Sequence, residues 1–220
     1  MFTLTYKKRT KKNIFKSTLF IVLGLSVLTS CSNEDDYAIP PYKPVFFSEN
    51  FEKSATGAGS TEVPIAIEGW VNTNVTGTRV WVGKLYNKNN FAEFSSNFSA
   101  ANTTDDVWLI SDKIDFTKTI NETLTFTSVN RFYDGGVLKV YVSEDYDGTT
   151  AGITTATWTE LNPILPTSAA QNDVNVKSGQ MDISSFDGDN VRIAFRYQGS
   201  KTTGPKTTFQ LDNIKVYENK

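Results

Sequence analysis

The chain has 220 residues, with 22 basic and 24 acidic side chains, one cysteine and no histidine. Without histidine there is no Ser-His-Asp or Cys-His nucleophile and no imidazole ligand for zinc, copper or iron, so enzymes that depend on these groups are excluded. Chemistry by carboxylate, lysine or tyrosine side chains stays open, and no redox cofactor is expected.

Residues 1–30 have the form of a bacterial signal peptide. Their apolar run, 19–28, is too short to span a bilayer. It follows six basic residues: Lys7, Lys8, Arg9, Lys11, Lys12 and Lys16. The next residues, "LTSC" at 28–31, resemble the lipobox of bacterial lipoproteins, in which the cysteine receives diacylglycerol and the chain is cut just before it. We expect Cys31 to become the lipidated N-terminus; an ordinary secretory signal with a coincidental cysteine is the alternative.

The segment after Cys31 has the features of a surface tether. Residues 32–36, "SNEDD", resemble the acidic export signal of lipoproteins that some Gram-negative bacteria display on the outer membrane, although a plain acidic spacer is the alternative. Residues 37–44 contain three prolines, which favour an extended, semi-rigid chain. We therefore expect residues 31–44 to link a domain, residues 45–220, to the outer membrane at the cell surface.

Cleavage before Cys31 changes the charge of the protein. It removes six basic residues and no acidic ones, which leaves 16 basic and 24 acidic residues and a net charge of −8. Such a surface is a poor partner for nucleic acid. With its only cysteine lipidated, the chain forms no disulfide, so a hydrophobic core must stabilise the domain.

From residue 45 onward the apolar pattern is that of β-strands. Apolar and polar side chains alternate in 138–142 and in 191–197, so one face of each strand is expected to be buried. Further strand-like runs cover 44–51, 78–86, 106–116, 122–132, 157–161 and 208–217. About ten short strands at this spacing predict an all-β domain, a two-sheet antiparallel β-sandwich of the jelly-roll type.

The last predicted strand changes parity in its middle. Phe209 and Leu211 share one parity, whereas Ile214 and Val216 share the other. All four face the core only if the strand gains one residue near Asp212, so we predict a β-bulge there. A bulge re-aims the Asp212 side chain and leaves carbonyl groups unpaired, a geometry that suits a hard cation; a capping turn is the alternative.

The order of these segments resembles a known group of secreted domains. The most specific parts are "FSENFE" at 47–52, "WLIS" followed by "IDF" within 108–116, and "LDNIKV" at 211–216. With further matches at 69–70, 138–148, 158–161 and 178–197, they look like the choice-of-anchor J and cleaved-adhesin group, which is related to MAM-type jelly rolls. The resemblance covers almost the whole folded region. It implies a non-catalytic β-sandwich of bacterial surface proteins, often acting in adhesion or binding.

Several members of that group hold a structural calcium ion between the first and last strands. The resemblance places the candidate ligands at Glu49 and Asp212, with Asp106 as a third. Calcium takes about six to eight oxygen ligands, several from backbone or water, so three carboxylates are a plausible core of a site. The alternative is that Glu49 and Asp212 cap turns or form salt bridges at the sheet edges.

Four tryptophans raise the question of a sugar platform, because flat indole rings stack on sugar faces. Trp108 lies in an apolar run and is expected between the sheets, and Trp158 is expected to pack as well. Trp81, near Tyr86, and Trp70, in a polar region, are the candidate glycan-binding residues. Core or loop packing is the alternative for both.

These features predict a surface-anchored, non-catalytic binding lipoprotein that recognises a glycan or a protein partner. An accessory subunit of an outer-membrane assembly, such as a glycan importer, is the alternative, and a large exposed apolar patch would favour it. A glycosidase or lyase would need two carboxylates roughly 5 to 10 Å apart in a cleft, and the acids scattered along the sequence do not indicate such a pair. The sequence predicts neither the ligand nor the oligomeric state.

The lipoprotein assignment depends on Cys31 and is tested directly by Cys31→Ser. We expect the variant to lose incorporation of labelled palmitate and to leave the membrane fraction, because no other residue offers a thiol for lipidation. Palmitate labelling or full membrane retention of the variant would contradict the assignment.

Overall fold

The computed structural model describes residues 43–57 and 60–219. Cys31, the predicted signal peptide and most of the predicted tether lie outside these residues, so the domain boundaries at 30 and 44 stay predictions. Residues Tyr42–Lys220 form one compact unit. Among the described residues, no helix has the length and apolar character that crossing a bilayer requires.

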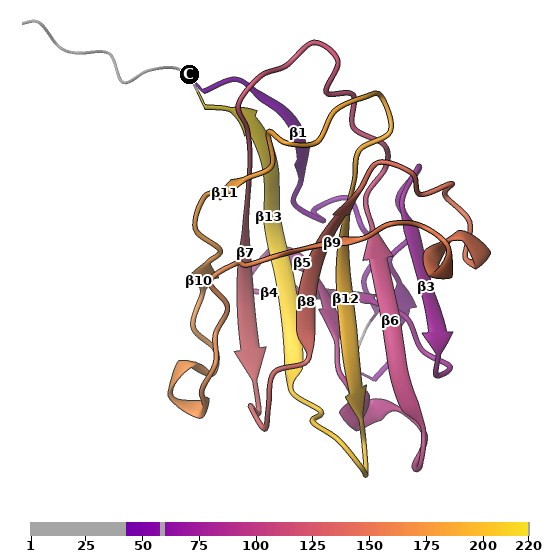
Figure 1. Ribbon diagram of the computed structural model, residues 1–220. Helices are drawn as coiled ribbons and strands as arrows, with labels where there is room; N and C mark the ends of the chain where they lie inside the picture. The colour runs from indigo at the N-terminus through magenta and orange to yellow at the C-terminus, as the bar shows by residue number, and fades with distance from the viewer. Residues whose placement is uncertain (1–42, 58–59, 220) are drawn as a thin grey trace, which may run out of the picture. The chain divides into compact units, whose positions relative to one another are not determined.

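The larger of two sheets, called sheet A, contains eight strands (Figure 1). Their bounds are β1 (Val45–Glu49), β2 (Val63–Pro64), β4 (Val82–Tyr86), β5 (Asn89–Phe94), β7 (Glu122–Arg131), β10 (Val176–Lys177), β11 (Met181–Asp182) and β13 (Thr208–Glu218). The order is β10-β7-β13-β5-β4-β2, with β1 also paired to β13 and β11 also paired to β7. All these pairings are antiparallel.

The second sheet, called sheet B, contains five strands in the order β3-β6-β12-β8-β9. Their bounds are β3 (Val71–Thr76), β6 (Thr104–Ile110), β8 (Leu138–Ser143), β9 (Thr159–Leu161) and β12 (Arg192–Ser200). Three short 3₁₀ helices, η1 (Ser96–Phe98), η2 (Ala151–Thr154) and η3 (Ala169–Gln171), lie in the connections. The predicted fold class is confirmed: the domain is an all-β, two-sheet antiparallel sandwich of the jelly-roll type.

The main core lies between the two sheets and takes alternate residues from their inner faces. Leu124 and Phe126 from sheet A meet Phe195 and Tyr197 from sheet B in one buried cluster. The Phe126 and Phe195 rings lie edge to face, with centroids 5.2 Å apart. This alternation is the pattern expected of strands that bury one face.

Strand β13 contains the predicted β-bulge. Its pairing with β7 shifts register between Asp212 and Lys215, and Asn213 has a left-handed backbone with φ of 53°. As a result, apolar residues on both sides of the bulge face the core. A regular strand would turn two of them, Ile214 and Val216, toward solvent, at a cost of about 1.5–3 kcal/mol each.

The outer face of sheet B is covered by a second apolar cluster. Trp108 lies there, not between the sheets as predicted, because its neighbours Val107 and Leu109 occupy the inner face. The loop 144–158 folds over it and brings Trp158 to 5.1 Å from Trp108, measured between ring centroids. This face of the sandwich is therefore closed by the protein's own aromatic side chains.

Two fully buried tyrosines differ in what their hydroxyl groups do. The Tyr197 hydroxyl accepts a hydrogen bond from the Ser96 N–H at 3.1 Å and donates one to the Thr207 carbonyl at 2.9 Å. The Tyr146 hydroxyl, although buried, has no hydrogen-bond partner within the described part of the chain. The first hydroxyl fastens η1 to the end of sheet A, and the second only fills space.

Replacing each tyrosine by phenylalanine separates these roles. We expect Tyr197→Phe to lower the free energy of unfolding by about 1–3 kcal/mol, because the buried Ser96 N–H loses its acceptor. Tyr146→Phe should leave stability within about 0.5 kcal/mol of wild type, or raise it, because an unpaired buried hydroxyl is removed. Chemical denaturation of both variants measures the difference, and equal losses would refute this assignment of roles.

Candidate functional site

A groove of about 1040 Å³ crosses the outer face of sheet A. Residues from β4, β5, β7 and β13 and from the segment 173–177 line it. Most of the residues that line it are polar by type, and five of them carry amide side chains: Asn87, Asn89, Asn175, Gln210 and Asn213. Unlike the outer face of sheet B, this face is open to a ligand.

Strand alternation decides which side chains reach the groove. In β4 and the residue before it, Trp81 and Gly83 are buried, whereas Lys84 and Tyr86 line the groove. The register pairs Lys84 with Phe91 and Tyr86 with Asn89, so the matching residues of β5 share that face. In β5 and β7 the groove residues are every second residue, and the residues between them face the core. In β4 the exposed Leu85 lines the groove as well.

The polar side chains of the groove are held in pairs across neighbouring strands. Gln210 Nε2 donates to Glu93 Oε2 at 2.9 Å, which links β13 to β5. Asn89 Nδ2 donates to Asp212 Oδ2 at 3.0 Å and makes a second link between the same strands. These contacts fix the orientation of the four side chains before any ligand arrives.

A third pair closes the far side of the groove. Arg131 Nε lies 2.5 Å from Asp173 Oδ1, which ties the end of β7 to the segment before β10. The Asp173 side chain is largely exposed and that of Arg131 is partly exposed, so the pair contributes little to stability. Its effect is to position a guanidinium group and a carboxylate along the groove.

Two aromatic side chains lie among these polar groups. Tyr86 stands at the end of β4 with 71% of its surface exposed, and the turn beside it, Asn87-Lys88, has a positive φ at both residues. Phe91 is only 8% exposed and lies outside the main core, so it forms part of the floor. The groove therefore contains one exposed aromatic ring, Tyr86, and one buried aromatic ring, Phe91.

Asp212 is a groove carboxylate whose pKa is raised. Partial burial raises its pKa above the ordinary 3.8, and the nearby Glu52 and Glu49 carboxylates add to the increase. Hydrogen bonds from the Asn89 side chain and the Asn213 N–H oppose it. Asp212 faces outward beside Asn89 because it alternates with the buried Leu211, and the bulge begins directly after it at Asn213.

The prediction that Trp81 is an exposed sugar platform is wrong. Trp81 is fully buried, and its ring packs in the main core 6.0 Å from Phe94 and 6.5 Å from Tyr197. The reason is the strand alternation described above, because Trp81 and Tyr86 have opposite parity. The exposed aromatic of this hairpin is therefore Tyr86.

Trp70 is half-buried and packs beside the first strand. Its ring stacks on Phe47, with centroids 6.2 Å apart, and meets Phe51 edge to face at 6.0 Å. It does not line the groove on sheet A. Its role as a glycan-binding residue stays a prediction without a contact to that site.

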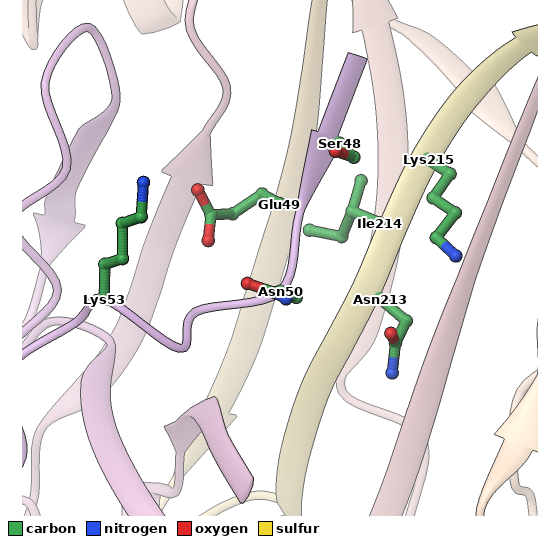
Figure 2. Close-up of a pocket in the computed structure, with 7 residues that line it drawn as sticks. All are labelled: Ser48, Glu49, Asn50, Lys53, Asn213, Ile214 and Lys215. Carbon is green, nitrogen blue, oxygen red and sulfur yellow. The ribbon is translucent and has the colours of Figure 1, made fainter. Parts of the chain in front are cut away.

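Glu49 and Asp212 line different cavities. Glu49 lies in a separate pocket of about 310 Å³, where Lys53 and Lys215 are the other charged residues (Figure 2). Figure 2 shows the Glu49 carboxylate on the Lys53 side of β1, whereas Asn213 and Lys215 project from the other side of β13. Glu49 Oε1 accepts the Phe51 N–H at 2.5 Å, so it caps the turn after β1.

Asp106 lies in the other sheet and already has its partners. It pairs with Arg196 through two contacts of 2.6 and 2.8 Å and accepts the Trp108 Nε1–H at 2.9 Å. Within residues 43–57 and 60–219, no group of three or more acidic side chains is placed to hold a metal ion. The three predicted ligands do not meet, because Asp106 lies on β6 of sheet B, so they do not fit one calcium ion; calcium binding itself stays a prediction.

A family match covers the second half of the domain. The family described as "Domain of unknown function (DUF5017)" matches residues 112–218. This span contains β7 to β13 and so includes Arg131, Asp173 and Asp212, but it excludes the β4–β5 hairpin with Tyr86. A comparison with curated proteins finds no match.

Several solved structures are similar to the domain. The K1 cleaved adhesin domain of Lys-gingipain from Porphyromonas gingivalis W83 has 16% identity and a TM-score of 0.49, covering 79% of this chain and 98% of that one. TmCBM61, solved with beta-1,4-galactotriose, has 12% identity and a TM-score of 0.46, covering 77% and 94%. The CBM22-1 xylan-binding domain of Xyn10C from Paenibacillus barcinonensis has 14% identity and a TM-score of 0.41, covering 81% and 97%.

These likenesses do not by themselves assign an activity, since identities are below 25% and TM-scores below 0.5. The similarity to a cleaved adhesin domain agrees with part of the resemblance seen in the sequence. The choice-of-anchor J part of that resemblance stays a prediction.

Sequence reasoning missed most of the groove. Glu93, Gln210 and Arg131 have no motif that marks them, since each is one polar residue on the open face of a strand. Tyr86 carried a usable signal, because its parity is opposite to that of the buried Trp81 directly before β4. Asp212 was found, as a predicted calcium ligand, through the parity change in its strand.

The raised pKa of Asp212 predicts a pH-dependent gain from Asp212→Asn. At neutral pH the wild-type carboxylate is charged in a partly buried site near other acids, so removing the charge should raise the melting temperature. The stability that protonated Asp212 provides is present below its ordinary pKa and is lost as pH rises through the raised pKa. The advantage of the variant should therefore shrink as pH falls from about 7 to 4.

Asp182→Asn is a matched control of opposite sign. Hydrogen bonds from the Ser184 hydroxyl and N–H lower the pKa of Asp182, so its charged form is favoured in the folded state. This control should be less stable than wild type at pH 7, with a difference that disappears in acid. Thermal unfolding from about pH 7 to about pH 2 measures both, because the difference for Asp182→Asn disappears only as pH falls below the ordinary pKa of 3.8. A constant difference for Asp212→Asn would count against the raised pKa.

Proposed function

We propose that this domain is a non-catalytic carbohydrate-binding domain whose ligand lies in the groove on sheet A. The observation that carries the proposal is the exposed Tyr86 ring, held beside the linked pairs Asn89–Asp212 and Gln210–Glu93. A sugar ring offers an apolar face to an aromatic ring, and its hydroxyl groups donate and accept hydrogen bonds. The groove supplies both kinds of contact.

The residue types favour a glycan over a protein partner. A protein interface would centre on a fully buried apolar core, and the accessory-subunit interpretation calls for a large exposed apolar patch. Here most of the residues that line the groove carry amide or charged side chains, and they surround the exposed side chains of Leu85 and Tyr86. Amides present a donor and an acceptor on one rigid plane, which suits ligands with many hydroxyl groups.

Hydrolysis is the second function to consider, because the groove holds two carboxylates. Glu93 pairs directly with Gln210, so Asp212 is its diagonal neighbour on the same face, at a backbone spacing of roughly 7–8 Å. Glycosidases use carboxylate pairs at comparable separations. Each carboxylate here already accepts an amide hydrogen bond, from Gln210 or from Asn89, and this supports a role in binding.

The location of the protein is part of the proposal. The basic and apolar segment before Cys31, the residues "LTSC" and the acidic, proline-rich segment that follows support a lipoprotein of the outer membrane. In this proposal lipid on Cys31 holds the protein at the cell surface, and residues 31–44 extend the domain toward polysaccharide outside the cell. The domain then binds the polysaccharide, which the cell uses as a nutrient or as a surface for adhesion.

The proposal is tested with the mature chain, residues 31–220, carrying Cys31→Ser to leave it unlipidated. Affinity gel electrophoresis through soluble xylan, galactomannan, β-1,4-galactan and polygalacturonate should show retardation by at least one polymer. Tyr86→Ala should reduce the affinity about fivefold or more, which is typical of losing a central aromatic contact.

Phe98→Ala is the matched control. Phe98 is also an exposed aromatic, at 59%, but it lies in η1 and not in the groove. Its variant should bind as wild type does. Failure of all four polymers to bind, or equal losses in both variants, would overturn the proposal, and release of reducing ends from a bound polymer would favour hydrolysis.

A further inference from the structure

Phe132, directly after β7, is an exposed aromatic in an unusual backbone conformation. It is 73% exposed, and its φ is 52°, a left-handed value that a bulky side chain rarely adopts. Phe51 has a similar φ of 57° but is fully buried against Trp70, so packing accounts for it. Burial does not account for Phe132. Strained residues of this kind tend to occur where a side chain is presented to a ligand.

The backbone around Phe132 is fixed on both sides. Before it, the Asn130 carbonyl accepts the Asp173 N–H at 2.9 Å, and the Asn130 side chain donates to the Ser168 carbonyl at 3.1 Å. After it, the Tyr133 N–H donates to Asn172 Oδ1 at 3.2 Å. The ring is therefore held outward by a rigid frame, which lowers the entropy lost when a ligand binds it.

The Phe132 ring lies next to a residue that lines the groove on sheet A. The guanidinium of Arg131 lies 5.5 Å from the centre of the ring, and Arg131 lines the groove. The ion pair of Arg131 with Asp173 holds that guanidinium in place. The ring thus adjoins the groove at the end of β7.

Tyr86 lies at one corner of the groove, and Phe132 follows Arg131 at the opposite corner. Between β4 and β7 lie three strand spacings, or about 14 Å, because β5 and β13 intervene. Tyr86 is level with Asn89, whereas the end of β7 at Arg131 is level with Thr208, about six residues or 20 Å farther along the strands. The two rings are therefore roughly 25 Å apart, much farther than one or two sugars reach.

We infer that Phe132 is a second aromatic binding residue and that the ligand is an extended polysaccharide chain that contacts Phe132 and Tyr86 at once. This inference rests on the proposed function and adds the size of the ligand to it. The chain lies diagonally across β4, β5, β13 and β7, and the polar pairs of the groove bind its hydroxyl groups between the two rings. Short saccharides fill only part of this path.

The test uses the mature Cys31→Ser chain and the polysaccharide among the four that retards it, cut to oligosaccharides of two to eight units. Phe132→Gly removes the ring and keeps a residue that readily adopts the left-handed backbone. Isothermal titration calorimetry should show wild-type affinity rising with chain length up to the longest oligomers. In Phe132→Gly this rise should stop early, and affinity for the eight-unit chain should fall about fivefold or more.

The matched variants make the outcomes distinguishable. Tyr86→Ala should also lose affinity for the eight-unit chain, the double variant should lose the product of both factors because the rings are far apart, and Phe98→Ala should lose none. If Tyr86→Ala loses binding while Phe132→Gly binds the eight-unit chain within about twofold of wild type, the inference fails and the proposed function stands. If wild type binds none of the polymers, both fail.

Discussion

The arrangement of sheet A depends on one extra residue in strand β13. This strand pairs with β1, β5 and β7, so its register sets the positions of most of the sheet. The left-handed Asn213 absorbs the extra residue and lets apolar side chains on both sides of it face the core. Asp212, directly before the slip, faces outward by alternation with Leu211, accepts a hydrogen bond from Asn89 and joins the groove.

The two outer faces of the sandwich differ, because one is covered by apolar side chains and the other carries a polar groove. On sheet B, the loop 144–158 packs Trp158 against Trp108, and the Asp106–Arg196 ion pair lies beside them. On sheet A, the strands present amides, charges and Tyr86 along a groove. One face thus adds to stability through buried aromatic surface, and the other keeps polar groups oriented for a ligand.

The fold was more predictable than the site. Alternating runs such as 138–142 and 191–197 predict β8 and β12, because burying one face imposes a period of two. The parity change in β13 even located its bulge. Strands β3 and β5 were missed, since "VNTNVT" and "NNFAEF" carry too few apolar residues in alternation to stand out from loops.

The site eluded prediction for a different reason. A groove on a sheet face is built from single polar residues on several strands, and only strand order brings Glu93, Gln210 and Arg131 together. The tryptophans of the sequence suggested Trp81 as a glycan-binding residue, but Trp81 is buried in the main core. The exposed position of Tyr86 follows from strand alternation, whereas that of Phe132 goes with a left-handed backbone that composition does not encode.

The central claim is that the open face of sheet A is the ligand-binding surface. Mapping backbone amide chemical shifts of the isotope-labelled mature chain during titration with a bound oligosaccharide tests it most directly. The account predicts shift changes along one face of β4, β5, β13 and β7, including the amides of Tyr86, Glu93, Gln210 and Asp212. Changes confined to sheet B, or to the loop 144–158, would contradict it.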